Sequence, residues 1–333
     1  MDLRRCRSAT VAAVKWLLTQ QNSDGAMVPV EHGVATHNRV LWALNDMGQQ
    51  PRAALLCRWL REYGLGEEGD FGGLLRPAPY DRFYAVGNAF LVVGAMRLGQ
   101  YAIGYPALDF ITNLQHPQSG GFLTAGPEAT LDDEQDLLTT ATCGLACLQG
   151  GQLESAERAG RFLLKLWEDQ PGGAAARLFM VVNEGNKIVT ECEPEVALWY
   201  AVDINRAEQA YFIPALGAGF LAALYDATGA PEFLEGMHNY LQFVDSCGED
   251  RYRSEKSAFV GWAHALAYEI TGNANYLRAA EQVVDALLAT QLANGSWLKG
   301  SMGADLTSDV VDATAEGVIV LNQVLRSLAG AEE

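Results

Sequence analysis

Short segments that share one spacing of glutamine, glycine and a large apolar residue recur along the chain, each where a helical pattern ends. The members are Gln291, Gly295 and Trp297 in QLANGSW, Gln21, Gly25 and Met27 in QNSDGAM, Gly69 and Phe71 in EEGDF, and Gln115 and Phe122 in QHPQSGGF, where one residue is inserted. Such recurrence is typical of repeat architectures, in which a unit buries its apolar face only against its neighbours. The chain is therefore expected to fold as linked copies of one unit.

The unit is a pair of helices. Six pairs are predicted, at 5–20 and 35–48, 51–63 and 83–98, 101–115 and 134–149, 152–169 and 208–227, 231–246 and 257–271, and 274–291 and 309–329. The first helix of a pair mixes apolar and charged residues, as in AAEQVVDALLATQ, whereas the second is poor in charge, as in AYFIPALGAGFLAALYDATG. Because a helix that is apolar all round must be buried, the second helices are expected inside. The prediction is an all-α, single-domain (α/α)6 toroid over residues 1–333.

The loops of the expected toroid alternate in length. Loops from inner to outer helices are short, with Gly229 and Gly272 placed as helix C-caps, whereas loops from outer to inner helices are long. Because function gathers on loops held by a rigid scaffold, the long-loop face is expected to carry the site. The segment RLFMVVNEGNKIVTE predicts a small β-hairpin inserted around 177–191. It is either a lid over the mouth or an insertion without such a role.

Composition and charge limit the classes of binding partner that the chain can have. A formal net charge of −18 disfavours nucleic acid, which requires clustered Lys and Arg. No apolar run reaches the length of a membrane span, about 20 residues. The six cysteines contain no C-x-x-C pair, so we interpret them as reduced, mostly buried thiols of a cytoplasmic protein. The expected partner is a small-molecule substrate, with no metal and no cofactor, and a homodimer is left open.

Two family resemblances follow from these segments. Gln291, Gly295 and Trp297 resemble the QW repeat of squalene-hopene and oxidosqualene cyclases, which share the α/α toroid with protein prenyltransferase β-subunits. In this resemblance the Gln amide satisfies backbone groups of a neighbouring helix and the aromatic ring packs on the next repeat. Separately, VGWAHALAYEITGNANYLRAA and the segment before it resemble the repeats of six-hairpin carbohydrate enzymes, such as unsaturated glucuronyl hydrolases and sugar epimerases.

The chemical motifs of the cyclases are only partly present. Their Asp-x-Asp-Asp-Thr-Ala motif has its counterpart in DLLTTA, which keeps Asp136 but places Leu138 where the central acid belongs. Cys143 lacks the nearby histidine of a prenyltransferase zinc site, so that activity is excluded. Fold resemblance alone does not define chemistry, and candidate residues must be weighed individually.

Five residues are candidates for catalysis, all at or within the expected inner helices. Asp309 and Asp312 lie three residues apart on one helix face and could form a general acid with its orienting partner; alternatively, Asp309 caps the helix and Asp312 is solvated. Asp136 opens the third inner helix, where the helix dipole favours a carboxylate whatever its function. His37 and His264 are either catalytic or hydrogen-bonded core residues.

Five further residues are candidates for substrate binding. They are Tyr84, Asn88, Tyr211, Trp262 and Glu195. Aromatic faces suit either a carbocation or a sugar ring, and core packing is the alternative for each ring.

Three functions remain open. The first is a metal-independent cyclase or isomerase of specialised metabolism that folds an apolar polyene or terpenoid-like substrate in the toroid cavity. The second is a carbohydrate-active hydrolase, lyase or epimerase that uses carboxylates at the rim. The third is a toroid that binds a ligand without catalysis. The QW-like segments favour the first.

Overall fold

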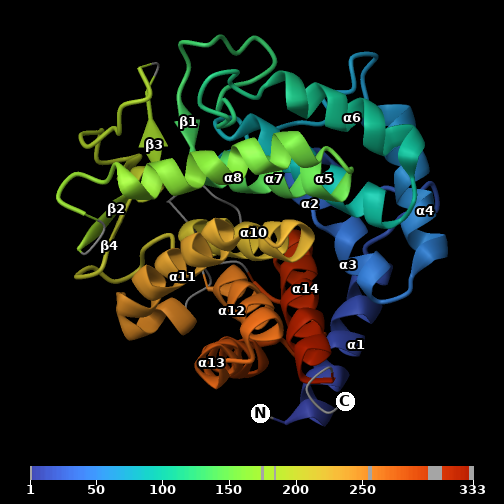
Figure 1. The fold of residues 1–333 in the computed structure, drawn as a ribbon. Coiled ribbons are helices and arrows are strands. Elements are labelled where there is room, and N and C mark those ends of the chain that lie inside the picture. The colour runs from blue at the N-terminus through green and yellow to red at the C-terminus, as the bar shows by residue number, and fades with distance from the viewer. Residues whose placement is uncertain (1, 174–175, 184, 254–256, 299–309, 330–333) are drawn as a thin grey trace.

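The structure is a computed structural model that describes residues 2–173, 176–183, 185–253, 257–298 and 310–329. Within these residues, six helical hairpins follow one another and the last packs on the first, so that α1 and α14 lie side by side (Figure 1). The predicted all-α (α/α)6 toroid is confirmed.

The helices occupy an outer and an inner layer. The outer helices are α1 (Leu3–Thr19), α4 (Gln50–Trp59), α6 (Tyr101–Asn113), α8 (Leu153–Glu168), α11 (Pro231–Ser246) and α13 (Ala274–Thr290). The inner helices are α2 (Val34–His37) with α3 (Val40–Asp46), α5 (Tyr84–Arg97), α7 (Leu137–Gln149), α10 (Phe212–Thr228), α12 (Ala258–Thr271) and α14 (Val310–Ala329). Because outer and inner helices alternate along the chain, every inner helix begins at the long-loop face and ends at the short-loop face.

Burial follows the sequence pattern. In the inner helix α5 every residue from Ala85 to Met96 is buried, as expected for a helix enclosed on all sides. The outer helix α8 buries one stripe only, at Ala156, Ala159, Gly160, Phe162, Leu163 and Leu166. This three- and four-residue spacing places one face on the inner layer and leaves the opposite face to solvent.

The first inner helix departs from the prediction of one continuous helix over 35–48. It is interrupted between α2 and α3, at Asn38 and Arg39. The Asn38 side-chain amide donates to the carbonyl oxygens of Val34 at 2.9 Å and Ala35 at 3.1 Å. Side-chain hydrogen bonds of this kind compete with the helix ladder. The first inner helix is therefore broken at the residue that precedes Arg39.

The glutamine segments join each hairpin to the next. In three of them the Gln Nε2 donates both to the carbonyl oxygen of its own glycine and to one in the following outer helix. These acceptors are Gly25 and Arg52 for Gln21, Gly120 and Ser155 for Gln115, and Gly295 and Ala9 for Gln291, all at 2.8 to 3.0 Å. Because Ala9 lies in α1, the last of these joints closes the ring.

Close backbone contact at the joints requires glycine. Gly25 has φ +109° and Gly295 has φ +95°, a region that side chains rarely adopt. A Cβ at Gly25 would lie 2.3 Å from the Leu55 carbonyl oxygen, and one at Gly295 would lie 2.6 Å from that of Ala12. In both joints the outer-helix residue that contacts the glycine lies three residues after the one whose carbonyl oxygen accepts from the glutamine.

The insertion before α10 contains only short strands and one short helix. Strand β2 (Arg177–Phe179) pairs with β4 (Ala201–Asp203), and β3 (Val181–Val182) pairs with β1 (Gln135–Asp136), both antiparallel. Within the predicted hairpin, Val182 forms an isolated antiparallel bridge to Ile188. The strands nevertheless pair mainly outside the hairpin, because β3 is buried against the segment that leads into α7. The short helix α9 (Ala197–Tyr200) precedes β4.

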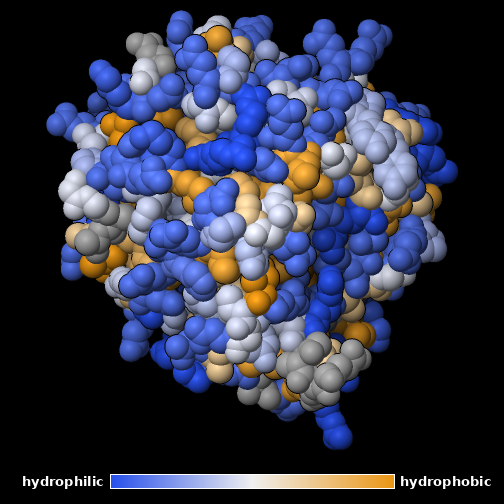
Figure 2. Space-filling model, viewed as in Figure 1, coloured by the Kyte–Doolittle hydropathy of each residue, from blue (hydrophilic) through white to orange (hydrophobic). Residues whose placement is uncertain are grey.

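The surface shown in Figure 2 is mostly hydrophilic, with scattered apolar patches. None of the helices in the described ranges combines the length and the apolarity that crossing a membrane demands. All six cysteines are free thiols; Cys192 is exposed and the other five are buried.

We predict that Gly295→Ala destabilises the fold by about 3 kcal/mol, because the added methyl meets both an unfavourable φ and the α1 backbone. Gly272 is the matched control: its φ is +66°, but no heavy atom lies within 4 Å of the added Cβ. Gly272→Ala should therefore lose only about 1 kcal/mol. Urea denaturation measures both, and equal losses would refute the role of the joint.

Candidate active site

Asp312 lies at the start of the sixth inner helix, only 2% exposed. Both of its carboxylate oxygens lie 2.6 Å from Arg39 Nη1. Solvation, one alternative considered from the sequence, is therefore wrong for this residue. Its predicted partner Asp309 lies outside the described residues.

A cluster of charged and polar side chains forms around Arg39. The Arg39 guanidinium also donates to the Tyr80 hydroxyl at 3.1 Å and lies 3.9 Å from Glu316 Oε2. The Tyr80 hydroxyl in turn lies 3.5 Å from Asp312 Oδ2. We call Arg39, Tyr80, Asp312 and Glu316 the central cluster. Arg39 lies at the α2–α3 junction, Tyr80 in the loop before α5, and Asp312 and Glu316 in α14. All four side chains are buried.

Electrostatics keep Arg39 of the central cluster charged. Burial alone lowers the pKa of Arg39, but Asp312, Tyr80 and Glu316 outweigh burial and raise that pKa above its ordinary value. An opposite charge this close likewise favours an ionised carboxylate. Asp312 is therefore placed as a base or an electrostatic partner and not as a ready proton donor.

Aromatic side chains of the inner helices pack against Arg39 of the central cluster and against one another. The Arg39 guanidinium carbon lies 4.4 Å from the centre of the Phe90 ring and 5.5 Å from that of Phe259. Phe259 contacts Trp262 at 5.7 Å, and Trp262 contacts Trp42 at 5.9 Å. We call Trp42, Phe90, Phe259 and Trp262 the aromatic floor. Trp262, a predicted substrate-binding residue, is 3% exposed within it.

A second polar group lies beside the insertion. Arg82 Nη2 is 3.0 Å from Glu134 Oε2, and the Tyr200 hydroxyl lies 2.8 Å from both Glu134 oxygens. The Arg82 and Glu134 side chains are 31% and 34% exposed, so solvent reaches them. Burial, followed by the hydrogen bond to Glu134, raises the pKa of Tyr200. We call Arg82, Glu134 and Tyr200 the rim cluster.

The rim cluster borders aromatic side chains. Trp199, next to Tyr200, is half-buried, with its ring 5.0 Å from that of Phe83 and 6.3 Å from that of Phe212. Phe83 follows Arg82, and Phe212 begins the inner helix α10. One loop, 77–83, therefore supplies Tyr80 to the central cluster and Arg82 to the rim cluster.

A small cavity adjoins the central cluster. It has a volume of about 150 Å³ and lies between α12, α13 and α14. Glu316, Tyr252, Ser257 and Trp297 are among the residues that line it. Glu316 therefore connects this cavity with Arg39.

Asp136 caps the third inner helix. Its Oδ1 accepts from the Thr139 backbone N–H and its Oδ2 from the Thr124 hydroxyl, each at 2.8 Å. Burial raises the pKa of Asp136 and outweighs these hydrogen bonds, which act in the opposite direction. Capping thus accounts for the position of this carboxyl, and burial favours its protonated form.

His37 is enclosed between the layers. Its ring stacks on Trp59 with the ring centres 4.7 Å apart, its Nδ1 lies 2.6 Å from the Gly33 carbonyl oxygen and its Nε2 accepts from the Met27 backbone N–H at 3.2 Å. Both ring nitrogens contact backbone groups and the side chain is fully buried. The structure therefore supports the core alternative for His37.

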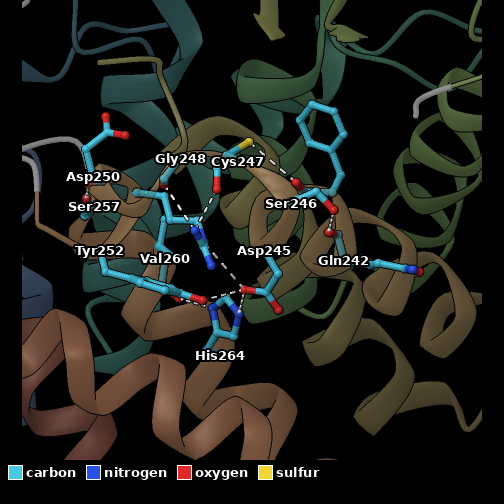
Figure 3. A network of polar contacts seen from close by, with 12 residues as sticks. Gln242, Asp245, Ser246, Cys247, Gly248, Asp250, Tyr252, Ser257, Val260 and His264 are labelled. Atoms are coloured by element: carbon cyan, nitrogen blue, oxygen red, sulfur yellow. Dashed lines mark hydrogen bonds and ion pairs between the residues drawn. The ribbon is translucent and has the colours of Figure 1, made fainter. Parts of the chain in front are cut away.

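His264 faces the outer layer, as Figure 3 shows. Its Nε2 lies 3.2 Å from Asp245 Oδ1, near the end of α11, and Nδ1 lies 2.8 Å from the Val260 carbonyl oxygen. The Tyr252 hydroxyl donates to the same Asp245 oxygen at 2.7 Å. Burial alone would raise the pKa of Asp245, but His264, Tyr252 and Arg251 outweigh burial and lower that pKa. This network joins α11 to α12.

The remaining predicted binding residues are dispersed. The Tyr84 hydroxyl and Asn88 Nδ2 both bond to Asp70, the latter at 2.7 Å, and Arg76 lies 3.7 Å above the Tyr84 ring. This closed group lies at the start of α5.

Two further predicted residues lie elsewhere. Tyr211 is fully buried and donates to Asp250 at 2.8 Å. Glu195 is exposed in the insertion. Of the nine predicted site residues whose positions are described, Asp312 alone belongs to the central cluster.

Sequence reasoning missed Arg39, Tyr80, Glu316 and Arg82. One signal was available for Arg39, since VATHNRVLWAL places an arginine within an otherwise apolar inner-helix pattern. Asp312 was itself a candidate, but nothing local indicated that it would pair with an arginine 273 residues away. Among the residues with described positions, no three His, Cys, Asp or Glu side chains are arranged to hold a metal ion.

The fold is shared with solved structures of enzymes, at low identity. A sugar epimerase from a ruminal bacterium matches with TM-score 0.70 and 12% identity, over 98% of this chain and 99% of that chain. A family 76 glycoside hydrolase, an α-mannanase of Bacteroides thetaiotaomicron, matches with TM-score 0.66 and 10% identity, over 98% and 97%. A variant of the type II terpene cyclase MstE from Scytonema matches with TM-score 0.62 and 12% identity, over 98% of both chains. The sequence matches no protein-family model and no curated protein.

We predict that Asp136→Asn stabilises the protein at neutral pH. Folding raises the pKa of this carboxyl above 3.8, so the native state holds its proton more tightly than the unfolded chain, and stability is lost as pH rises through the unfolded value towards the folded one. Asn keeps the cap without the buried charge. Urea denaturation should show the gain at neutral pH and none below pH 3.8; a larger gain in acid would contradict it.

The central ion pair yields a second prediction. Asp312→Ala leaves Arg39 with only the longer Glu316 contact at 3.9 Å as counter-charge and should cost about 3–5 kcal/mol, whereas Arg39→Met combined with Asp312→Leu removes both charges of the pair and should cost less. Denaturation of both variants measures this difference. A double variant as unstable as the single one would show that the pair itself stabilises the fold.

Proposed function

We propose that the protein is a carbohydrate-active enzyme that performs acid–base chemistry on a saccharide at the long-loop face. The observation that carries this proposal is the central cluster, in which carboxylates and a tyrosine hydroxyl gather around one arginine at the ring axis. Groups of this kind suit a substrate with many hydroxyls, each a donor and an acceptor. The resemblance in fold to a sugar epimerase and a glycoside hydrolase supports the proposal.

Each part of the site receives a role in this proposal. Arg39 orients the substrate and holds Asp312 ionised for use as a general base. Glu316, which lines the adjoining cavity, is the second acid–base group. The exposed rim cluster binds a neighbouring part of the substrate, with the Trp199 ring as a stacking surface. Product analysis distinguishes cleavage of a glycosidic bond from removal of a proton from a sugar C–H.

The acid-initiated cyclase receives support from one observation. Asp136 has a raised pKa and precedes the Thr-Thr-Ala sequence that resembles the cyclase motif. Two hydrogen bonds engage it as a helix cap, however, and Asp312 faces a guanidinium instead of an apolar cavity. A cyclase would need an acid free to protonate an alkene. For this reason the carbohydrate proposal stands first.

Thermal unfolding against two ligand classes tests the choice. Oligosaccharides, neutral and acidic, are compared with apolar polyenes and terpenoids. A ligand at 100 times its dissociation constant adds about 2.7 kcal/mol, which should raise the midpoint by a few degrees for a chain of this size. We expect a shift with saccharides alone. A shift with polyenes alone would overturn the proposal in favour of the cyclase.

Once a saccharide substrate is found, matched variants test the residues. Asp312→Asn should lower kcat by about 100-fold or more, because it removes the general base. Asp245→Asn is the control, since that carboxylate also bonds an inner-helix side chain but belongs to the outer-layer network. Its kcat should remain near that of the unmodified chain. Equal kcat in both variants would exclude Asp312 from the chemistry.

A further inference from the structure

A cavity lies at the short-loop end of the inner helices. A chamber of about 600 Å³ lies at the carboxyl ends of the inner helices, and Trp42 and Trp262 of the aromatic floor line it. The central cluster contacts the other side of the same floor through Phe90 and Phe259. We call this cavity the lower chamber. Its volume falls within the range of small-molecule sites, about 300–1,000 Å³.

All six inner helical segments contribute to the lower chamber. One residue from each, in chain order, is Trp42, Arg97, Gln149, Asp226, Glu269 and Gln323. Because each contributing helix ends at this face, the chamber is built by the toroid itself and by none of the long loops. It is therefore distinct from the candidate active site.

Polar side chains in the lower chamber are already oriented. Glu269 Oε1 accepts from Gln323 Nε2 at 2.9 Å and from the Ser327 hydroxyl at 2.8 Å. Arg97 bonds to Asp46 at 2.8 Å and its guanidinium carbon lies 5.3 Å from the centre of the Trp42 ring. Hydrogen bonds that fix side chains before binding reduce the entropy lost when a ligand is held.

The charges of the lining indicate a neutral ligand. Arg97 and Arg326 oppose a cation, whereas Asp226 and Glu269 oppose an anion. Gln149 and Gln323 add both donors and acceptors. A ligand that uses all of these groups carries donors and acceptors of its own together with an apolar face for the indole rings.

We propose that the lower chamber binds a neutral mono- or disaccharide. Sugar hydroxyls donate to Asp226 and Glu269 and accept from Gln149 and Arg326, while the C–H face of the ring lies towards Trp42 and Trp262. This binding site is separate from the proposed active site, and the proposal stands whatever reaction occurs there.

Isothermal titration with maltose, cellobiose and mannobiose tests the proposal, with spermidine and L-arginine as charged comparators. Three variants locate the binding. Ala223→Trp fills the chamber, Glu269→Gln removes one charge at nearly constant shape, and Asp312→Asn alters only the central cluster. Loss of one charged hydrogen bond weakens binding by about tenfold or more.

The proposal predicts that at least one saccharide binds, that Ala223→Trp abolishes this binding, that Glu269→Gln weakens it about tenfold, and that Asp312→Asn leaves it unchanged. If Ala223→Trp does not fold, Glu269→Gln and Gln149→Ala decide by the same criterion. Loss of binding in Asp312→Asn alone would place the saccharide at the long-loop face and overturn the proposal. Binding of the charged comparators only, or of no probe, would also overturn it.

Discussion

The fold depends on one contact between backbones, in which a glycine in a loop lies directly against the next outer helix. At Gly25 and Gly295 no side chain fits, because a carbonyl oxygen of that helix occupies the space a Cβ would take. The neighbouring glutamine amide then bonds loop and helix together. Hydrophobic burial alone would let adjacent hairpins slide, whereas this joint fixes their spacing. Its repetition holds each of these loops against the following outer helix.

What meets at the axis is a buried charge cluster between aromatic rings. A buried ion pair recovers its desolvation cost only with good geometry, and apolar replacements are often as stable. Stability is thus a weak reason to keep Arg39 and Asp312 together, and the proposed chemistry at the long-loop face is a stronger one. The same rings that pack on Arg39 separate this face from the lower chamber. One aromatic layer therefore divides the axis into two environments.

The sequence predicted helices and layers well, because apolar periodicity and glycine placement are local signals. α11 begins and ends where the pattern placed it, at Pro231 and Ser246. The direction in which a side chain points could not be predicted in the same way. His264 was predicted to be either catalytic or a hydrogen-bonded core residue, and it bonds to Asp245 of α11; a helical pattern that is apolar all round carries no information about which neighbour a polar residue meets. Arg39 was missed because its partner is brought near only by closure of the ring.

The most direct test of the account is a crystal structure of the chain with a saccharide that raises its unfolding temperature. The account predicts sugar density at the long-loop face, within hydrogen-bonding distance of Asp312, Glu316 or Glu134. A second molecule in the lower chamber would be compatible with this result. A polyene seated against the aromatic floor, or a saccharide that leaves the long-loop face empty at saturation, would contradict the claim that the central cluster processes sugars.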